Sequence, residues 1–183
     1  MEKRQIIRVI NIHPLVQSII GTALYGLLSW SANTFPLPAV QDITFRPGVA
    51  VLIFFGIAYG PWVGLLVGFL GNTLGDVLSN WGFYWNWSLG YGIMGMVAGF
   101  FARANHNFRA PAEILKAICW GTLGIAVGLL FASLTQVVVS DIDLTTALQD
   151  YFKPFFIGDF AVIVILLPIL MIAFAAVAAH RGR

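Results

Sequence analysis

The chain is organised around one stretch, Asn72-Thr-Leu-Gly-Asp76-Val-Leu-Ser-Asn80-Trp81-Gly-Phe-Tyr84-Trp85-Asn86-Trp87. An apolar, glycine-rich run leads into this stretch and another follows it. Asn72 and Asp76 stand four residues apart, so on a helix they share one face. Because such groups are costly to bury in hydrocarbon, they are expected to face protein, water or a ligand.

The aromatic residues that follow supply flat, rigid surface beside these few polar groups. Apolar and aromatic walls with sparse hydrogen-bonding groups are typical of a small-molecule site. Trp and Tyr also collect at membrane boundaries, so the cluster equally fits an interfacial aromatic belt. Composition by itself slightly favours the belt, whereas the polar pair at the mouth of the cluster favours a site.

The composition indicates a membrane protein. Hydrophobic residues make up 59% of the 183 residues and charged residues only 10%, with a mean hydropathy of +0.86. A soluble chain carries about 25% charged residues. We therefore expect an all-α integral membrane protein, with residues 1–183 forming a single membrane domain. The net charge of +2 is too small and too scattered to indicate nucleic acid binding, and Cys119 is the sole cysteine, so no disulfide forms within the chain.

The apolar runs predict a bundle of six transmembrane helices, at about residues 15–32, 48–59, 62–78, 87–102, 114–139 and 155–178. Pro47 suits the first turn of the second helix, and Gly60-Pro61 ends that helix. Residues 33–46 are predicted to form a loop or re-entrant segment, and residues 140–150 an acidic connection. The first apolar run is predicted to be a retained helix rather than a signal peptide, because no small-residue cleavage site follows it.

The charge distribution predicts the orientation, because cytoplasmic loops carry an excess of Lys and Arg. With six spans, the basic residues on the side of the termini are Lys3, Arg4, Arg8, Arg103, Arg109, Lys116, Arg181 and Arg183, and only Arg46 and Lys153 fall opposite. The acidic residues on the opposite side are Asp42, Asp141, Asp143 and Asp150. Both termini are therefore expected to be cytoplasmic.

Catalytic arrangements are absent from the sequence at membrane depth. The three histidines, His13, His106 and His180, all fall at the predicted cytoplasmic edge, which argues against an intramembrane protease. The sequence has no Walker A motif and no zinc-type spacing. We therefore expect no enzyme, no metal site and no cofactor.

Polar groups collect instead at the predicted outer helix ends. Arg46 begins the second helix, Asp76 ends the third, Asn86 precedes the fourth, and Asp159 lies in the first turns of the sixth. Arg46 and Asp76 are also consistent with a structural salt bridge, and Asp159 with a cap or a snorkelling side chain. Their presence together beside the aromatic cluster predicts an outward-facing pocket, whose expected ligand-binding residues are Arg46, Asn72, Asp76, Trp81, Tyr84, Trp85, Asn86, Trp87 and Asp159.

Four stretches of the chain resemble the substrate-binding S components of energy-coupling-factor (ECF) vitamin transporters, and most closely the riboflavin-type group: residues 23–30, 46–52, 55–76 and 85–95. The most specific part runs from Phe55-Gly-x-x-x-Gly-Pro61 to Gly71-Asn72-x-x-x-Asp76. The resemblance implies a multi-pass protein of a prokaryotic plasma membrane that captures a water-soluble vitamin from outside. Its partners would be a coupling transmembrane subunit and two cytoplasmic ATPases. Riboflavin is the first expected vitamin, and cobalamin or another heteroaromatic vitamin is next.

The resemblance also implies that a small-residue motif on the first helix contacts the coupling subunit. Thr22 and Gly26 occupy that place, where alanines are more usual. Small residues four apart let another helix approach closely, so packing inside the chain's own bundle is the alternative. The family's ligand contacts are implied in places that here hold Arg46, the cluster from Trp81 to Trp87, and Asp159.

Two hypotheses of other classes stand beside the S component. A self-sufficient ion-coupled carrier or channel would need a polar path through the membrane, yet the fifth and sixth predicted helices carry almost no polar groups below their outer ends. A purely structural assembly subunit would make no use of the clustered aromatic residues.

Overall fold

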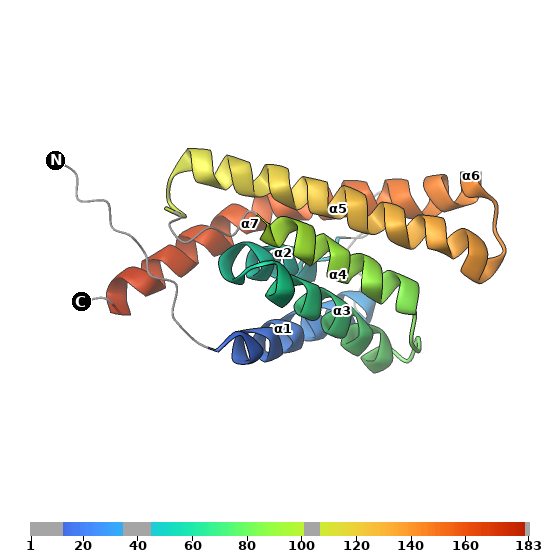
Figure 1. The fold of residues 1–183 in the computed structure, drawn as a ribbon, viewed down its shortest axis with the longest axis horizontal. Helices are drawn as coiled ribbons and strands as arrows, with labels where there is room; N and C mark the ends of the chain where they lie inside the picture. The colour runs from blue at the N-terminus through green and yellow to red at the C-terminus, as the bar shows by residue number, and fades with distance from the viewer. Residues whose placement is uncertain (1–12, 35–44, 101–106, 182–183) are drawn as a thin grey trace.

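The computed structural model describes residues 13–34, 45–100 and 107–181, and these residues form helices joined by turns (Figure 1). The main helices are α1 Pro14–Thr34, α2 Gly48–Tyr59, α3 Pro61–Leu78, α4 Trp85–Gly99, α5 Pro111–Ser140 and α7 Lys153–Arg181. A short helix α6, Leu144–Thr146, and a π-helical segment η1, Ala147–Phe152, precede α7. The prediction of an all-helical chain with six main helices is confirmed. Outside the described residues lie the predicted end of the fourth helix at 101–102, most of the 33–46 loop, and the charged residues Lys3, Arg4, Arg8, Asp42, Arg103 and Arg183.

Four helical segments are long and apolar enough to cross a membrane: α1, α3, α5 and the continuous stretch Leu144–Ala179. The other two main helices are shorter, with 12 residues in α2 and 15 in the described part of α4. At about 1.5 Å per residue they measure roughly 18 and 22 Å, less than the hydrocarbon core of about 30 Å. The structure therefore has the six predicted helices, of which four are long enough to span a membrane alone.

The shortness of α2 goes with its burial inside the bundle. Its residues from Gly48 to Ala58 are almost all buried. It contacts α1, α3, α4 and α7, and a helix that is apolar all round is stable only when it is enclosed in this way. At its end Gly60 adopts a φ of 104°, which only glycine reaches at low cost, and Pro61 begins α3 at the next residue.

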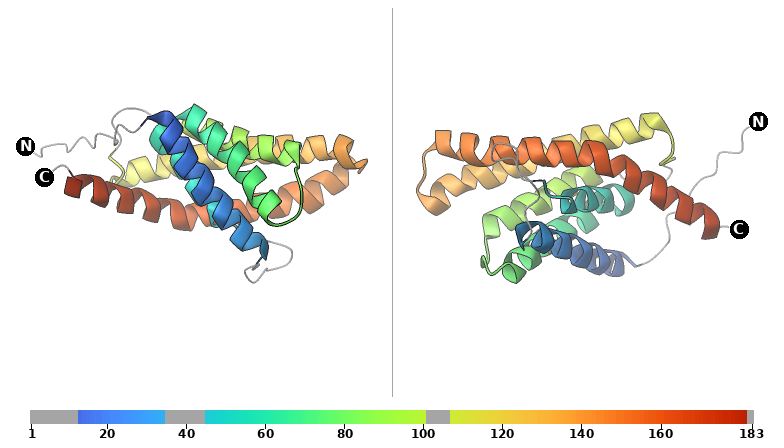
Figure 2. Two further views of the ribbon diagram at one scale, coloured as in Figure 1. Left: turned by 90° about the horizontal axis from the view of Figure 1, so that it is seen from below. Right: turned by 180° about the vertical axis from the view of Figure 1, so that it is seen from behind.

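The helices are arranged so that α3 packs between α1 and α4, α4 packs on α5, and α7 packs on α5 and α2 (Figures 1 and 2). The start of α1 and the end of α7 lie at the same end of the bundle. At the other end, the turn between α5 and α6 projects beyond the loop that joins α3 to α4, as both views in Figure 2 show. The end of α5, together with α6, η1 and the start of α7, forms this projecting arm, which stands at an angle to the α3–α4 loop.

Glycines bring the backbones of α3, α4 and α5 close together. A Cβ atom added at Gly64 would meet the carbonyl oxygen of Gly95, and one added at Gly68 would meet that of Tyr91. On the other side of α4, a Cβ at Gly90 would lie 2.7 Å from the carbonyl oxygen of Gly128. Such close approach is the usual basis of helix packing in lipid, where dispersion forces replace the hydrophobic effect.

The acidic connection is much shorter than the sequence suggested. Asp141 ends α5 in the left-handed conformation, with a φ of 51°. The Asp143 carboxylate then accepts a hydrogen bond from the Thr146 backbone N–H at 3.0 Å and caps α6. The Thr146 hydroxyl donates a second hydrogen bond to Asp143 at 2.7 Å, and this bond lowers the pKa of the Asp143 carboxyl. Helix α7 itself starts at Lys153, close to the predicted start near residue 155, but the chain is already helical from Leu144 onward, because the Asp143 cap restarts the helix earlier.

We predict that Gly68→Ala destabilises the protein by about 1–3 kcal/mol, because the added methyl group meets backbone atoms of α4 that have no room to move. Gly92→Ala is the control. Its Cβ would lie 3.1 Å from the end of the Leu65 side chain and 3.2 Å from the Leu65 carbonyl oxygen, contacts that a shift of a few tenths of an ångström relieves, so the loss is expected to be clearly smaller than at Gly68. Unfolding in detergent, followed by near-ultraviolet circular dichroism, measures both. Equal losses at the two sites would contradict close α3–α4 packing at Gly68.

Candidate functional site

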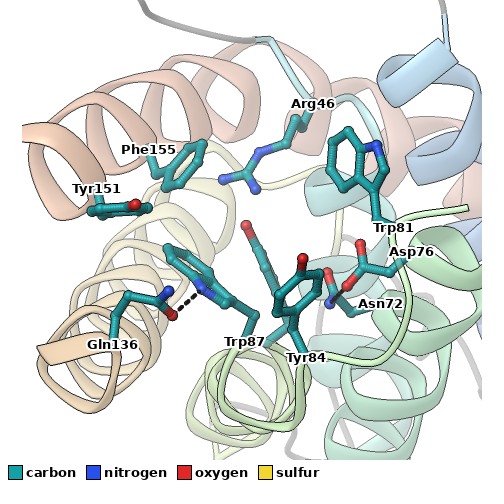
Figure 3. Close-up of a pocket in the computed structure, with 10 residues that line it drawn as sticks. Arg46, Asn72, Asp76, Trp81, Tyr84, Trp87, Gln136, Tyr151 and Phe155 are labelled. Atoms are coloured by element: carbon teal, nitrogen blue, oxygen red, sulfur yellow. Dashed lines mark hydrogen bonds between the residues drawn. The ribbon is translucent and has the colours of Figure 1, made fainter. Parts of the chain in front are cut away.

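A cavity of about 300 Å³ lies in the angle between the projecting arm and the α3–α4 loop (Figure 3). Ligand pockets measure about 300–1,000 Å³, so the cavity has the size of a compact small-molecule site. Its walls come from α3, α4, α5, the segment η1 and the start of α7. The lining residues are Arg46, Asn72, Asp76, Trp81, Tyr84, Trp87, Tyr91, Gln136, Tyr151 and Phe155.

Arg46 joins the start of α2 to α7 at the edge of this cavity. Its Nη2 atom donates to Oδ2 of Asp159 at 2.9 Å. The Asp159 side chain is 0% exposed and that of Arg46 is 16% exposed, so the ion pair is buried. The guanidinium carbon lies 4.4 Å from the ring centre of Phe155 and 5.1 Å from that of Tyr91. The rings of Phe155 and Tyr91 thus stabilise the Arg46 guanidinium through cation–π contacts.

Asn72 and Asp76 share one face of α3, as their spacing predicted. The Asn72 amide donates to Oδ2 of Asp76 at 2.8 Å and to the Ser88 hydroxyl at 3.3 Å. The Thr73 hydroxyl also bonds that of Ser88, at 3.0 Å. Both Asn72 and Asp76 line the cavity. The α3 wall therefore presents an amide and a carboxylate that are already fixed in place by α4.

Gln136 fixes the aromatic wall on the opposite side. Its Oε1 atom accepts from the Trp87 indole N–H at 2.9 Å and from the Asn86 amide at 2.7 Å. Its own amide donates to the Ser140 hydroxyl at 2.7 Å. The Trp87 ring centre lies 5.2 Å from that of Phe155. One α5 side chain thereby holds the Trp87 indole in a single orientation against the cavity, as Figure 3 shows.

A family model described as "ECF-type riboflavin transporter, S component" matches residues 9–176, almost the whole chain. The chain belongs to this family. Membership confirms the resemblance seen in the sequence.

Curated relatives of this S component carry a less specific description. A UPF0397 protein of Vibrio atlanticus is 42% identical over 95 residues, which are 52% of this chain and 51% of the relative. A UPF0397 protein of Aliivibrio fischeri is 44% identical over 88 residues, covering 48% of this chain and 47% of the relative. One of Aliivibrio salmonicida is 44% identical over 82 residues, covering 45% and 44%. The chain therefore spans about half the length of the curated relatives it matches.

The structure of the S component brings most of the predicted ligand-binding residues to one cavity: Arg46, Asn72, Asp76, Trp81, Tyr84 and Trp87. Three others do not line it. Asp159 is paired with Arg46, and Asn86 is fully buried on α4, where it holds Gln136. Trp85 is 47% exposed and does not line the cavity, so for this one residue the alternative of an interfacial aromatic belt fits better.

The structure corrects two details of the prediction, the partner of Arg46 and the start of the fourth helix. Arg46 forms its ion pair with Asp159 and not with Asp76, so the expected salt bridge exists with another partner. Helix α4 begins at Trp85, and Asn86 therefore lies inside the helix rather than before it.

Four lining residues were not predicted: Tyr91, Gln136, Tyr151 and Phe155. Tyr91 follows Trp87 by four residues and so shares its helix face, a spacing visible in the sequence. Gln136 is an amide in an otherwise apolar helix, which marks it for a partner or a ligand. Tyr151 was missed because it lies before the predicted start of the sixth helix, whereas Phe155 is the first residue of that predicted helix and was not singled out among its apolar residues.

Thr22 and Gly26, the residues expected to contact a coupling subunit, lie in α1. A Cβ at Gly26 would lie 2.7 Å from the Leu74 side chain of α3, and the Thr22 hydroxyl is buried without a hydrogen-bond partner. This packing supports the alternative reading, in which these small residues serve the chain's own bundle.

We predict that Asp159→Leu destabilises this S component by about 3–5 kcal/mol, because it leaves the Arg46 charge buried without its partner. Lys116→Met is the control: Lys116 bonds Glu113 at the same 2.9 Å but is 61% exposed. Its loss is expected to be about 0–1 kcal/mol. Chemical unfolding in detergent measures both changes, and similar losses would show that burial of the Arg46–Asp159 pair does not matter.

Proposed function

We propose that this S component captures riboflavin at the outer face of a prokaryotic plasma membrane. It then delivers the vitamin to an ECF coupling subunit and two cytoplasmic ATPases, which drive uptake. The observation that carries the proposal is the cavity of about 300 Å³ with aromatic side chains on two opposite walls and polar groups between them. A flat heteroaromatic ring with polar edges fits such a space.

The aromatic walls supply affinity for a ring of this kind. Trp81 and Tyr84 lie on the α3–α4 side, and Trp87, Tyr151 and Phe155 lie on the arm side (Figure 3). Each aromatic pair contributes about 0.5–1.5 kcal/mol beyond the buried area. Each hydrogen bond to a charged partner adds about 1.5–3 kcal/mol. A few of each reach nanomolar binding, about −12 kcal/mol, after the entropy of capture.

The charges of the cavity favour a neutral ligand. The Arg46 cation is balanced by Asp159, so it does not call for a ligand anion. The Asn72 amide already donates to Asp76 and Ser88, so Asp76 and the Asn72 amide oxygen are the acceptors that this wall offers, and the imide edge of the riboflavin ring supplies an N–H donor for one of them. Riboflavin carries no net charge at neutral pH, which agrees with this balance.

Cobalamin is the rival vitamin. The cavity volume lies at the lower end of the range for ligand pockets and therefore favours a compact ring ligand over a large one. A self-sufficient carrier is less well supported. Among the described residues, the buried carboxylates are those of Asp76 and Asp159, and both lie at the cavity end of the bundle rather than along a path through it.

The coupling module is expected to dock on α1. The outer side of this helix is exposed and apolar, with Leu15, Ile19, Leu24 and Leu27 facing away from the bundle. The contact at Thr22 and Gly26 stays a prediction, and it would require α3 to move away from Gly26.

Riboflavin is expected to quench the tryptophan fluorescence of the purified protein at micromolar concentration or below. Trp87→Phe should weaken binding about tenfold or more, because it removes the indole that Gln136 fixes against the cavity. Trp85→Phe is the matched control, since it removes a neighbouring indole that does not line the cavity. Equal weakening by both variants would place the ligand elsewhere, and the absence of quenching would reject riboflavin as the substrate.

The proposed orientation, with both termini cytoplasmic, predicts the pattern of labelling by an impermeant thiol reagent in intact cells. A Cys119→Ser background removes the exposed native thiol. In that background Asp143→Cys should be labelled and Asn107→Cys should not, although both positions are exposed in the fold. Labelling of Asn107→Cys alone would reverse the orientation and direct the cavity towards the cytoplasm.

A further inference from the structure

Three buried polar atoms beside the cavity have no hydrogen-bond partner: Nε of Arg46, the hydroxyl oxygen of Tyr91 and Oδ1 of Asp159. Tyr91 is 2% exposed and Asp159 is fully buried, so bulk water does not satisfy these groups. Buried polar groups in native proteins nearly always have a partner, and the exceptions call for a specific explanation. A bound ligand would supply the missing partners here.

The three atoms belong to one cluster. The Arg46 guanidinium carbon lies 5.1 Å from the Tyr91 ring centre, and its Nη2 atom bonds Asp159 at 2.9 Å. Arg46 and Tyr91 both line the cavity, whereas Asp159 does not line it and lies behind Arg46, to which it is bonded. The unpaired atoms are therefore grouped on the side of the cavity where the start of α2 meets α4 and α7.

The chemistry of the cluster points to hydroxyl groups. The Arg46 Nε–H only donates, the Asp159 carboxylate oxygen only accepts, and the Tyr91 hydroxyl does both. A hydroxyl group also donates and accepts, so neighbouring hydroxyls satisfy the two groups that belong to lining residues, the Arg46 N–H and the Tyr91 hydroxyl. An anionic group fits less well, because the Arg46 charge is already balanced and its carboxylate partner would repel a second anion.

We propose that Arg46 and Tyr91, with Asp159 holding Arg46 in place from behind, form a polyol subsite, which binds the hydroxylated side chain of the ligand while the aromatic walls bind its ring. The proposal rests on the proposed function, since riboflavin combines a flat ring with a side chain of several hydroxyls. It assigns Tyr91 a direct ligand contact and sets the orientation of the ligand: the ring lies between Trp81 and Trp87, and the side chain lies against Arg46.

The test compares riboflavin with lumiflavin, which has the same ring but a methyl group in place of the hydroxylated chain. Both are titrated against the purified full chain in detergent. The wild-type protein is expected to bind riboflavin at least tenfold more tightly than lumiflavin. Tyr91→Phe should weaken riboflavin binding about three- to tenfold, the equivalent of one hydrogen bond, and leave lumiflavin binding unchanged.

Tyr25→Phe is the matched control for the loss of a buried tyrosine hydroxyl. The Tyr25 ring lies 6.1 Å from that of Tyr91 and is equally buried, but Tyr25 does not line the cavity. This variant should leave the binding of both flavins unchanged. A thermal unfolding scan of each variant shows whether it is folded, and the comparison of the two flavins on the wild-type chain needs no variant at all.

Each other outcome overturns a defined part of the proposal. Equal binding of the two flavins by the wild-type chain would overturn the subsite and leave the proposed function in place. So would a Tyr91→Phe variant that weakens both flavins alike, or neither. Failure of the wild-type chain to bind either flavin would overturn the proposed function, and with it the subsite.

Discussion

The buried ion pair between Arg46 and Asp159 holds the cavity end of the molecule together. It connects residues that lie 113 positions apart in the sequence, one just before α2 and the other in the first turns of α7. A charge in such an apolar bundle is stable only when its partner is in place, so the start of α2 and the start of α7 have to be positioned together. Phe155 and Tyr91, which flank the guanidinium, are positioned by the same constraint. The side of the cavity formed by Arg46, Tyr91 and Phe155 therefore depends on this one ion pair.

The remaining rigidity comes from the opposite kind of contact, in which side chains are absent. Glycines let α3, α4 and α5 approach until their backbones touch, and Gly68 does so directly against the Tyr91 carbonyl. Because α4 has no freedom to slide along α3, the side chains of Trp87 and Tyr91 are fixed relative to Asn72 and Asp76. Gln136 then extends this rigid unit to α5. A preorganised cavity of this kind binds a flat ligand without losing much further conformational entropy.

Much of the fold could be predicted because helix boundaries in this chain carry local signals. The Gly60-Pro61 break and the apolar runs set the ends of α2 and α3 to within one residue. The stretch before α7 failed for the opposite reason: its acidic residues suggest a loop, but Asp143 acts as a cap and the following residues are helical. In the site, the spacing of Asn72 and Asp76 was sufficient, whereas the pairing of Arg46 with Asp159 depends on how distant helices pack. Burial decided the rest, since Trp85 and Trp87 are equivalent in the sequence and only the fold distinguishes them.

The π-helical segment η1 has a consequence for how the site can diversify. In a π-helical segment each backbone hydrogen bond closes a turn that is one residue longer than in an α-helix, and such segments are frequent at functional sites. Deleting Phe152, the last residue of Ala147–Phe152, would restore an α-helical turn and rotate the residues before it by about 100° relative to α7. Tyr151 would then leave the cavity wall, while Phe155, which follows the segment, would stay. Insertions and deletions in this arm therefore offer a route to new ligand preferences that leaves the glycine-packed helices and the buried ion pair untouched.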